Sequence, residues 1–148
     1  MTDNDGFVYK ITQQGQVSTF ISGLTQVDGL AFDSNDNLYA ADGGDQAIYK
    51  YDALGNQSVF VQNTSYVPFE GLALDAQGNV YEADAFTNNL EVFDPSGNHI
   101  NSISLGYVAG GEMAFQPLAS TSSVPEPGLL ALLTGLGLGS LALRRRSR

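Results

Sequence analysis

The sequence contains no cysteine and no tryptophan, and its single histidine is His99. Without cysteine, disulfide bonds, thiolate metal sites and cysteine nucleophiles are all excluded. A lone histidine cannot supply an acid–base pair. The chain also holds no Ser-His-Asp arrangement, phosphate-binding loop or nucleotide-binding motif. The most common catalytic motifs are therefore missing from this sequence.

Basic residues are scarce outside the C-terminus. Four of the six are arginines after residue 143, so residues 1–127 hold only Lys10 and Lys50 against all 16 acidic residues. This part of the chain therefore carries a net charge of −14 and the tail carries +4. The acidic part would repel a phosphate backbone, so nucleic acid is excluded as a partner, whereas cations are permitted.

Two stretches of the chain repeat each other at an offset of 42 residues. Residues 29–33, Gly-Leu-Ala-Phe-Asp, correspond to residues 71–75, Gly-Leu-Ala-Leu-Asp. Residues 37–42, Asn-Leu-Tyr-Ala-Ala-Asp, correspond to residues 79–84, Asn-Val-Tyr-Glu-Ala-Asp. The middle of the chain is thus one unit repeated without insertion.

Partial copies flank the two full repeats. Residues 7–11 match residues 47–51, and residues 112–115 match residues 71–74. The chain therefore contains the second half of one repeat, two whole repeats and the first strand of another.

Each full repeat contains four short runs rich in Val, Ile, Leu, Tyr and Phe, separated by Asp, Asn and Gly. This pattern predicts antiparallel strands joined by hairpin turns. A unit of about 40–50 residues with four strands is typical of a β-propeller blade, so the expected fold class is all-β. The predicted strands lie roughly at residues 29–32, 38–41, 47–51, 58–61, 71–74, 80–82, 89–93 and 100–105.

Over about residues 7–115 the motifs Gly-Leu-Ala-x-Asp and Gly/Asp-Asn-x-Tyr-x-Ala-Asp resemble the NHL repeat. The wider group with this blade includes gluconolactonase-like and streptogramin-lyase-like propellers. The resemblance implies that residues 1–115 form a partial propeller of just under three four-stranded blades. Propellers close with about 4–8 blades, so upstream sequence or identical chains must supply the rest. Residues 1–6 also lack the basic start and apolar stretch of a secretory signal, and we therefore expect an N-terminally truncated chain.

The C-terminus has a different composition. Residues 116–123 are small and polar, which is typical of a linker. An uncharged apolar run from Leu129 to Leu143 predicts one transmembrane α-helix of about 22 Å, at roughly 1.5 Å per residue, which is short for a hydrocarbon core of ~30 Å. Basic residues stay on the cytoplasmic side, so the propeller would lie outside. The arginine cluster consists of Arg144, Arg145, Arg146 and Arg148.

The order of features in residues 124–148 resembles the PEP-CTERM sorting signal: the motif at 124–128, the apolar helix at 129–143 and the arginine cluster at 144–148. The resemblance implies recognition by an exosortase-type processing enzyme in bacteria that make exopolysaccharide or biofilm. It implies transient anchoring in the inner membrane, cleavage near the motif, and a final place at the cell surface or outside the cell. A plain membrane anchor is the alternative. The recognition residues would be Val124, Pro125, Glu126 and Pro127.

Candidate metal ligands lie where the repeats place equivalent carboxylates. Asp28 and Glu70 each precede the glycine that opens a repeat, and Glu112 lies near the same place, one residue out of register. The innermost strands of a propeller line its axis, so these side chains would converge at the mouth of the channel. In gluconolactonase-like relatives a carboxylate near this place helps to hold a divalent metal, and oxygen ligands suit Ca²⁺. The alternative is that all three are solvated loop residues.

Other recurring residues have structural interpretations. Aspartates at strand ends are expected to accept backbone N–H bonds in the turns; they are Asp33, Asp42, Asp52, Asp75, Asp84 and Asp94. Large apolar and aromatic side chains on the strands are expected to form the core between blades; they include Tyr39, Tyr49, Phe60, Tyr81 and Val92.

The sequence thus predicts an exported bacterial surface protein whose propeller is a non-catalytic module that binds an extracellular protein or polysaccharide. No catalytic residue is assigned. The alternative is a metal-dependent lactonase-like or streptogramin-lyase-like enzyme, whose site would be completed by blades outside this sequence.

Overall fold

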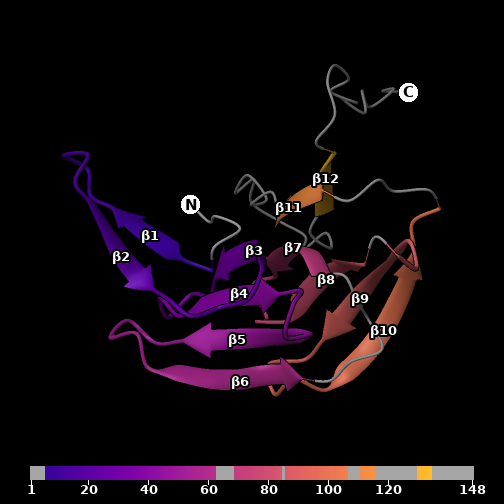
Figure 1. The fold of residues 1–148 in the computed structure, drawn as a ribbon. Coiled ribbons are helices and arrows are strands. Elements are labelled where there is room, and N and C mark those ends of the chain that lie inside the picture. Colours follow the sequence, from indigo (N-terminus) through magenta and orange to yellow (C-terminus); the bar gives the residue numbers. More distant parts are fainter. Residues whose placement is uncertain (1–5, 63–68, 85, 107–110, 116–129, 135–148) are drawn as a thin grey trace, which may run out of the picture.

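Antiparallel strands make up all the regular structure that the computed structural model describes, which covers residues 6–62, 69–84, 86–106, 111–115 and 130–134 (Figure 1). The first six strands are β1 (Val8–Ile11), β2 (Val17–Ile21), β3 (Val27–Phe32), β4 (Leu38–Asp42), β5 (Ala47–Tyr51) and β6 (Gln57–Gln62). The other six are β7 (Phe69–Leu74), β8 (Val80–Asp84), β9 (Asn89–Phe93), β10 (His99–Ser104), β11 (Gly111–Phe115) and β12 (Leu130–Thr134).

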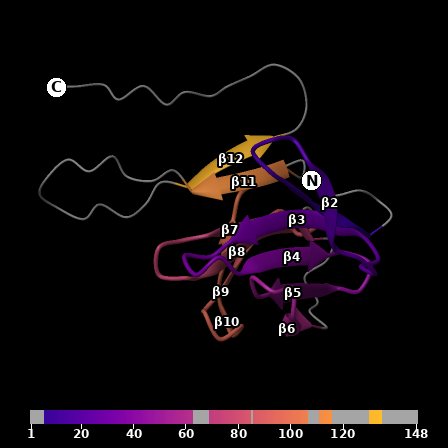
Figure 2. The same ribbon diagram turned by 90° about the vertical axis from the view of Figure 1, so that its left-hand side faces the viewer.

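Two complete four-stranded sheets form the centre of the molecule. The first blade has the order β3-β4-β5-β6, and the second blade, β7 to β10, repeats the same order of consecutive neighbours. Figure 2 shows β3 and β7 side by side, with the remaining strands of each blade leading away from them. The all-β class, the eight strands and their antiparallel pairing are confirmed, and the arrangement is that of a partial propeller.

The hairpin turns at the strand ends share one hydrogen-bond pattern. In the turn after β5, Asp52 Oδ1 accepts the N–H groups of Leu54 and Asn56 at 2.9 Å each, and the Asn56 side chain donates to Asp52 Oδ2 at 2.7 Å. Gly55 has a φ of 85°, which suits glycine because it has no Cβ. The Asn56 side chain and backbone bonds hold the pKa of Asp52 below its usual range. The same turn occurs at Asp33, Asp75 and Asp94.

Half-units flank the two blades. β1 pairs with β2 before the first blade, as expected for the second half of a repeat. At the other end β11 lies beside β7, as expected for the first strand of a further repeat.

Part of the predicted tail helix has a different structure. Leu130–Thr134, within the range 129–143, forms β12 and pairs with β11 from Gly111↔Thr134 to Phe115↔Leu130. A short apolar run does not by itself distinguish strand from helix, and the edge of β11 offers N–H and C=O groups that a strand satisfies. Among the described residues no helix has the length and apolarity to cross a membrane. The motif at 124–128, the rest of the predicted helix and the arginine cluster lie outside the described residues.

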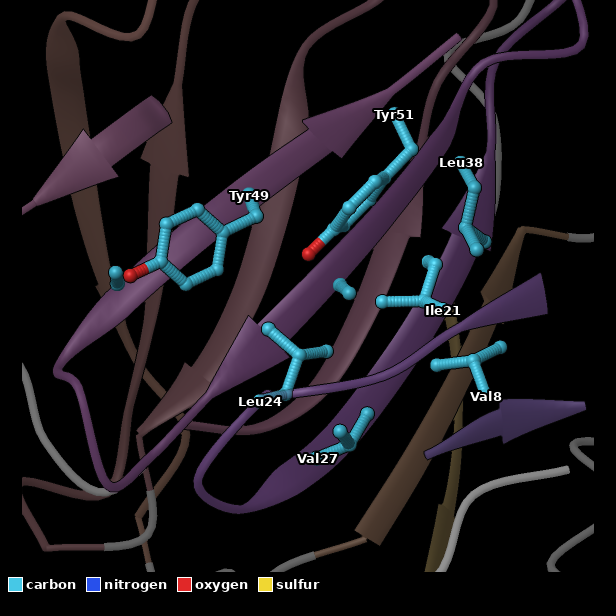
Figure 3. Packing of buried hydrophobic residues seen from close by; sticks show 9 residues of the cluster. Val8, Ile21, Leu24, Val27, Leu38, Tyr49 and Tyr51 are labelled. Atoms are coloured by element: carbon cyan, nitrogen blue, oxygen red, sulfur yellow. The ribbon is translucent and has the colours of Figure 1, made fainter. Parts of the chain in front are cut away.

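Apolar side chains fill the space on either side of the first blade. Figure 3 shows the side toward β1 and β2, where Val8, Ile21 and Leu24 lie against Leu38 and the two rings from β5. On the opposite side a second cluster joins the two blades; its buried members are Tyr39, Ala41, Ile48, Val61, Leu72, Val80 and Phe93. The predicted core positions are confirmed, since Tyr39, Tyr49 and Val92 are buried and Phe60 and Tyr81 pack against the clusters.

We predict that Ile48→Ala lowers the free energy of unfolding by about 2–5 kcal/mol, because Ile48 is fully buried between the blades and its loss leaves a cavity. Val59→Ala is the matched control: Val59 is 54% exposed, on the neighbouring strand, and its replacement should change stability by about 0.5 kcal/mol or less. Urea unfolding measures both. Equal losses in the two variants would contradict the packing of one blade on the other.

Candidate functional site

The inner strands of the two blades touch at equivalent glycines. A Cβ built on Gly29 would lie 2.9 Å from the Leu72 nitrogen and 3.2 Å from Gly71 Cα, which is too close for a side chain. Gly29 in β3 therefore lies directly against Gly71 in β7. Because Asp28 and Glu70 precede these glycines, this contact brings the backbones of two predicted ligands to the same end of neighbouring strands. We call this end, with the loops that follow β4 and β8, the entry end.

Both predicted ligands lie in β-bulges. The pairing register of β3 with β4 shifts between Val27 and Gly29, and that of β7 with β8 shifts between Phe69 and Gly71. Asp28 and Glu70 are thus the extra residues in the two ladders. A bulge redirects its side chain relative to the regular alternation of a strand, and such bulges are common next to active sites.

Asp28 has an unusual environment for a surface carboxylate. Its Oδ1 accepts a hydrogen bond from the Gln26 side chain at 3.1 Å, whereas its Oδ2 is buried and has no hydrogen-bond partner among the described residues. Gly43 is in close contact with Oδ2, since a Cβ on Gly43 would lie 2.5 Å from it. One carboxylate oxygen is therefore buried away from water and accepts no hydrogen bond from the described residues.

Burial raises the pKa of Asp28, and the nearby charge of Asp42 adds to the rise. The bond from Gln26 and the nearby Gly43 N–H oppose it but do not cancel it. The Gly43 N–H itself donates to the Gln26 carbonyl at 2.9 Å and is therefore engaged away from the Asp28 carboxylate. The ionised form of Asp28 is thus less favourable than that of Asp33, Asp52 and Asp94, whose pKa values are lowered.

A cation would satisfy the Asp28 Oδ2 atom that lacks a donor, and a carboxylate oxygen is a suitable ligand for Ca²⁺. In the described part of the chain, no group of three His, Asp or Glu side chains is close enough to hold a metal ion. The side chains of Glu70 and Glu112 lie outside that part, although their backbones belong to β7 and β11. The structure therefore gives the side-chain position of one predicted ligand, Asp28, and only the backbone positions of the other two, Glu70 and Glu112.

The aspartates that end the second strand of each blade are structural. Asp42 is fully buried and accepts backbone N–H bonds from Thr25 at 2.7 Å and Gln26 at 2.9 Å, and from Gly44 and Asp45 at 3.1 and 3.2 Å. Asp84 accepts the N–H groups of the two residues after Ala85 at 2.8 and 3.0 Å. The predicted backbone-capping role of these residues is confirmed.

A polar cluster that the sequence did not predict lies on the second blade. Glu91 is buried, and its Oε2 contacts His99 Nε2 at 2.6 Å and accepts a hydrogen bond from the Ser102 hydroxyl. The Ser102 hydroxyl also lies 3.2 Å from the same Nε2 atom. Because both contacts use one ring nitrogen, His99 cannot carry a proton from Ser102 to Glu91 as in a catalytic triad.

A β-bulge is the reason why the regular alternation of a strand does not predict this cluster. Residues three apart on a regular strand face opposite sides, but the register of β10 shifts between His99 and Asn101, so His99 and Ser102 share one side. Glu91 is also paired across the strands with Glu82, which is fully buried. At the corresponding positions the first repeat has Tyr49 and Ala40. This difference between the two repeats is the feature of the sequence from which the polar cluster could have been predicted.

We predict that Asp28→Asn stabilises the metal-free protein in a pH-dependent way. The folded-state pKa of Asp28 lies above its ordinary value of 3.8, so the stability that the protonated group provides is complete below 3.8 and is lost as the pH rises through the folded pKa. The advantage of the variant should therefore grow above pH 3.8 and then level off. Urea unfolding with a chelator present, between about pH 3 and pH 7, measures it. An advantage that shrinks with rising pH would contradict the burial of Asp28.

Solved structures with similar folds share low sequence identity with this chain. Regucalcin from Agrobacterium tumefaciens, described as a calcium-binding protein, is 20% identical with a TM-score of 0.63, over 72% of this chain and 39% of its own. A gluconolactonase from Xanthomonas campestris is 22% identical with a TM-score of 0.61, over 74% and 37%. Virginiamycin B lyase from Staphylococcus aureus is 16% identical with a TM-score of 0.59, over 76% and 39%. The chain thus spans about two fifths of each of these proteins.

These likenesses support the propeller fold, and the match to a family model is more specific. The comparison with curated proteins gives no match. The model of the family described as the SMP-30/Gluconolactonase/LRE-like region matches residues 1–116, which is most of the chain. The chain belongs to the SMP-30/gluconolactonase/LRE-like family.

Proposed function

We propose that this chain is part of a metal-dependent, lactonase-like propeller that binds Ca²⁺ at the entry end. The observation that carries the proposal is the buried Asp28 Oδ2 atom, which has no hydrogen-bond donor among the described residues and which a cation would satisfy. Membership of the gluconolactonase-like family supports it, as does the likeness to a calcium-binding regucalcin and a gluconolactonase.

The residues of this chain would have distinct roles in such a site. Asp28 would bind the cation through Oδ2, while the Gln26 side chain fixes its other oxygen. Glu70 is the second residue of the neighbouring inner strand β7 and is the next candidate ligand, followed by Glu112 on β11. The bound cation would polarise the carbonyl group of a lactone or ester. Further ligands would come from blades outside this sequence, since the chain spans only about two fifths of its solved relatives.

Calcium titration tests the proposal. We predict that Ca²⁺ releases or absorbs heat on binding and raises the melting temperature, and that Asp28→Asn weakens binding at least tenfold because the buried ligand loses its charge. Asp36→Asn is the matched control: it removes the same charge from an exposed turn position, and asparagine tolerates its φ of 62°. Isothermal calorimetry and thermal unfolding, at several salt concentrations, measure these effects.

Two outcomes would overturn the calcium site. The first is the absence of heat and of any melting shift in the unaltered protein. The second is an equal loss of affinity in both variants, because general attraction of cations to an acidic protein would weaken equally with either charge removed.

A second candidate function is favoured by the tail. The Pro-Glu-Pro motif, the apolar run and the arginine cluster support an exported protein that an exosortase-type enzyme sorts through the inner membrane to the cell surface, where the propeller binds a protein or polysaccharide. Leu130–Thr134 would have to leave β11 to enter a membrane, because a strand leaves its outer backbone groups unpaired in hydrocarbon. The strand and the membrane-inserted form of this segment therefore exclude each other.

Mass spectrometry of intact protein tests the sorting proposal. In cells that contain the processing enzyme, we predict that the mature protein ends near Pro125–Pro127 and lacks Arg148. A variant with Pro125 and Pro127 both replaced by alanine should stay at full length in the membrane fraction. Retention of Arg148 in the unaltered protein, in both envelope and medium, would exclude processing.

A further inference from the structure

An aromatic side chain stands exposed at the entry end. Phe86 follows β8, and 80% of its surface is exposed to solvent. Among the large apolar side chains of the described residues one other is at least as exposed: Leu54, at 87%, in the turn between β5 and β6 at the opposite end of the first blade. The two side chains therefore differ in position rather than in exposure.

The backbone at Phe86 is held in a defined conformation. Asp84 Oδ1 accepts the N–H of Phe86 at 2.8 Å and the N–H of Thr87 at 3.0 Å. The corresponding loop of the first blade has the same bonds, from Gly44 and Asp45 to Asp42. The residue before the third strand is also left-handed in both blades, with φ of 54° at Gln46 and 57° at Asn88. Phe86 thus occupies the loop position that Gly44 occupies in the first blade.

This loop lies at the same end of its blade as the candidate cation site. In the first blade its glycine at position 43 contacts the Asp28 carboxylate. The inner strands of the two blades meet at Gly29 and Gly71, so the equivalent loop of the second blade borders the same entry end. Phe86 therefore lies at the entry end together with Asp28, whereas Leu54 lies at the opposite end.

We propose that Phe86 determines the specificity of the cation site by packing against the apolar face of the ligand. The proposal rests on the cation site proposed above. A ligand that fits both features has oxygens that reach the cation and an apolar ring beside them, such as the carboxylate or lactone of an aromatic acid. An open-chain polyhydroxy acid has no ring or flat apolar face to pack against an exposed phenyl ring. Aromatic pairs add enough free energy to favour the first class by about threefold to tenfold.

Calorimetry with two unreactive carboxylates at saturating Ca²⁺ tests this inference. 3-Phenylpropanoate carries a phenyl ring, and gluconate carries hydroxyl groups in its place. In the full-length protein, Phe86→Ala should weaken 3-phenylpropanoate about threefold to tenfold and leave gluconate unchanged. Leu54→Ala, the control at the opposite end, should change neither affinity.

The outcomes separate the two proposals. Calcium binding that survives in the Phe86 variant, together with an unchanged affinity for 3-phenylpropanoate, would overturn the role of Phe86 and leave the cation site standing. Equal weakening of both carboxylates would show that the loop supports the site generally and would also overturn the specificity role. If the unaltered protein does not bind Ca²⁺, the cation site itself is overturned, and with it the role of Phe86.

Discussion

Packing of each blade against its neighbours is the constraint on which the rest of the structure depends. A four-stranded sheet of this kind has two apolar sides, and the first blade covers one with β1 and β2 and the other with the second blade. This packing requires the inner strands to approach closely, which only glycine permits where Gly29 meets Gly71. The bulges at Asp28 and Glu70 lie directly before these two glycines, so the core contact brings the backbones of both residues to the same end of the blades.

The recurring aspartates among the described residues divide into two groups by their hydrogen bonds. The turn aspartates and the strand-end aspartates accept two or more backbone N–H bonds each, which explains why they recur with the repeat. These bonds lower the pKa of Asp52 and Asp94, whereas burial raises that of Asp28. Asp28 recurs as a carboxylate at the equivalent position in the next repeat but lacks these backbone bonds. A recurring acid with one buried oxygen that has no hydrogen-bond donor among the described residues is therefore the best indicator of a ligand site in this chain.

Much of the fold could be predicted from the repeat, because a run copied at an offset of 42 residues must form the same unit twice. Local features that break the regular alternation of a strand could not. The bulge in β10 brings His99 and Ser102 to one side, and the bulge at Asp28 determines which way that carboxylate points. The segment Leu130–Thr134 is apolar enough for a strand or a helix, and its pairing with β11 depends on a contact distant in sequence. Sequence alone could place the candidate ligands on the chain but could not give their surroundings.

The proposed function depends on a cation site that includes Asp28 at the entry end. Crystals of the protein soaked with Tb³⁺, an anomalous scatterer that replaces Ca²⁺, test it most directly. We expect an anomalous peak about 2.3–2.6 Å from Asp28 Oδ2, with the Glu70 carboxylate on the same ion. Peaks found only at the exposed turn aspartates, with none beside Asp28, would contradict it.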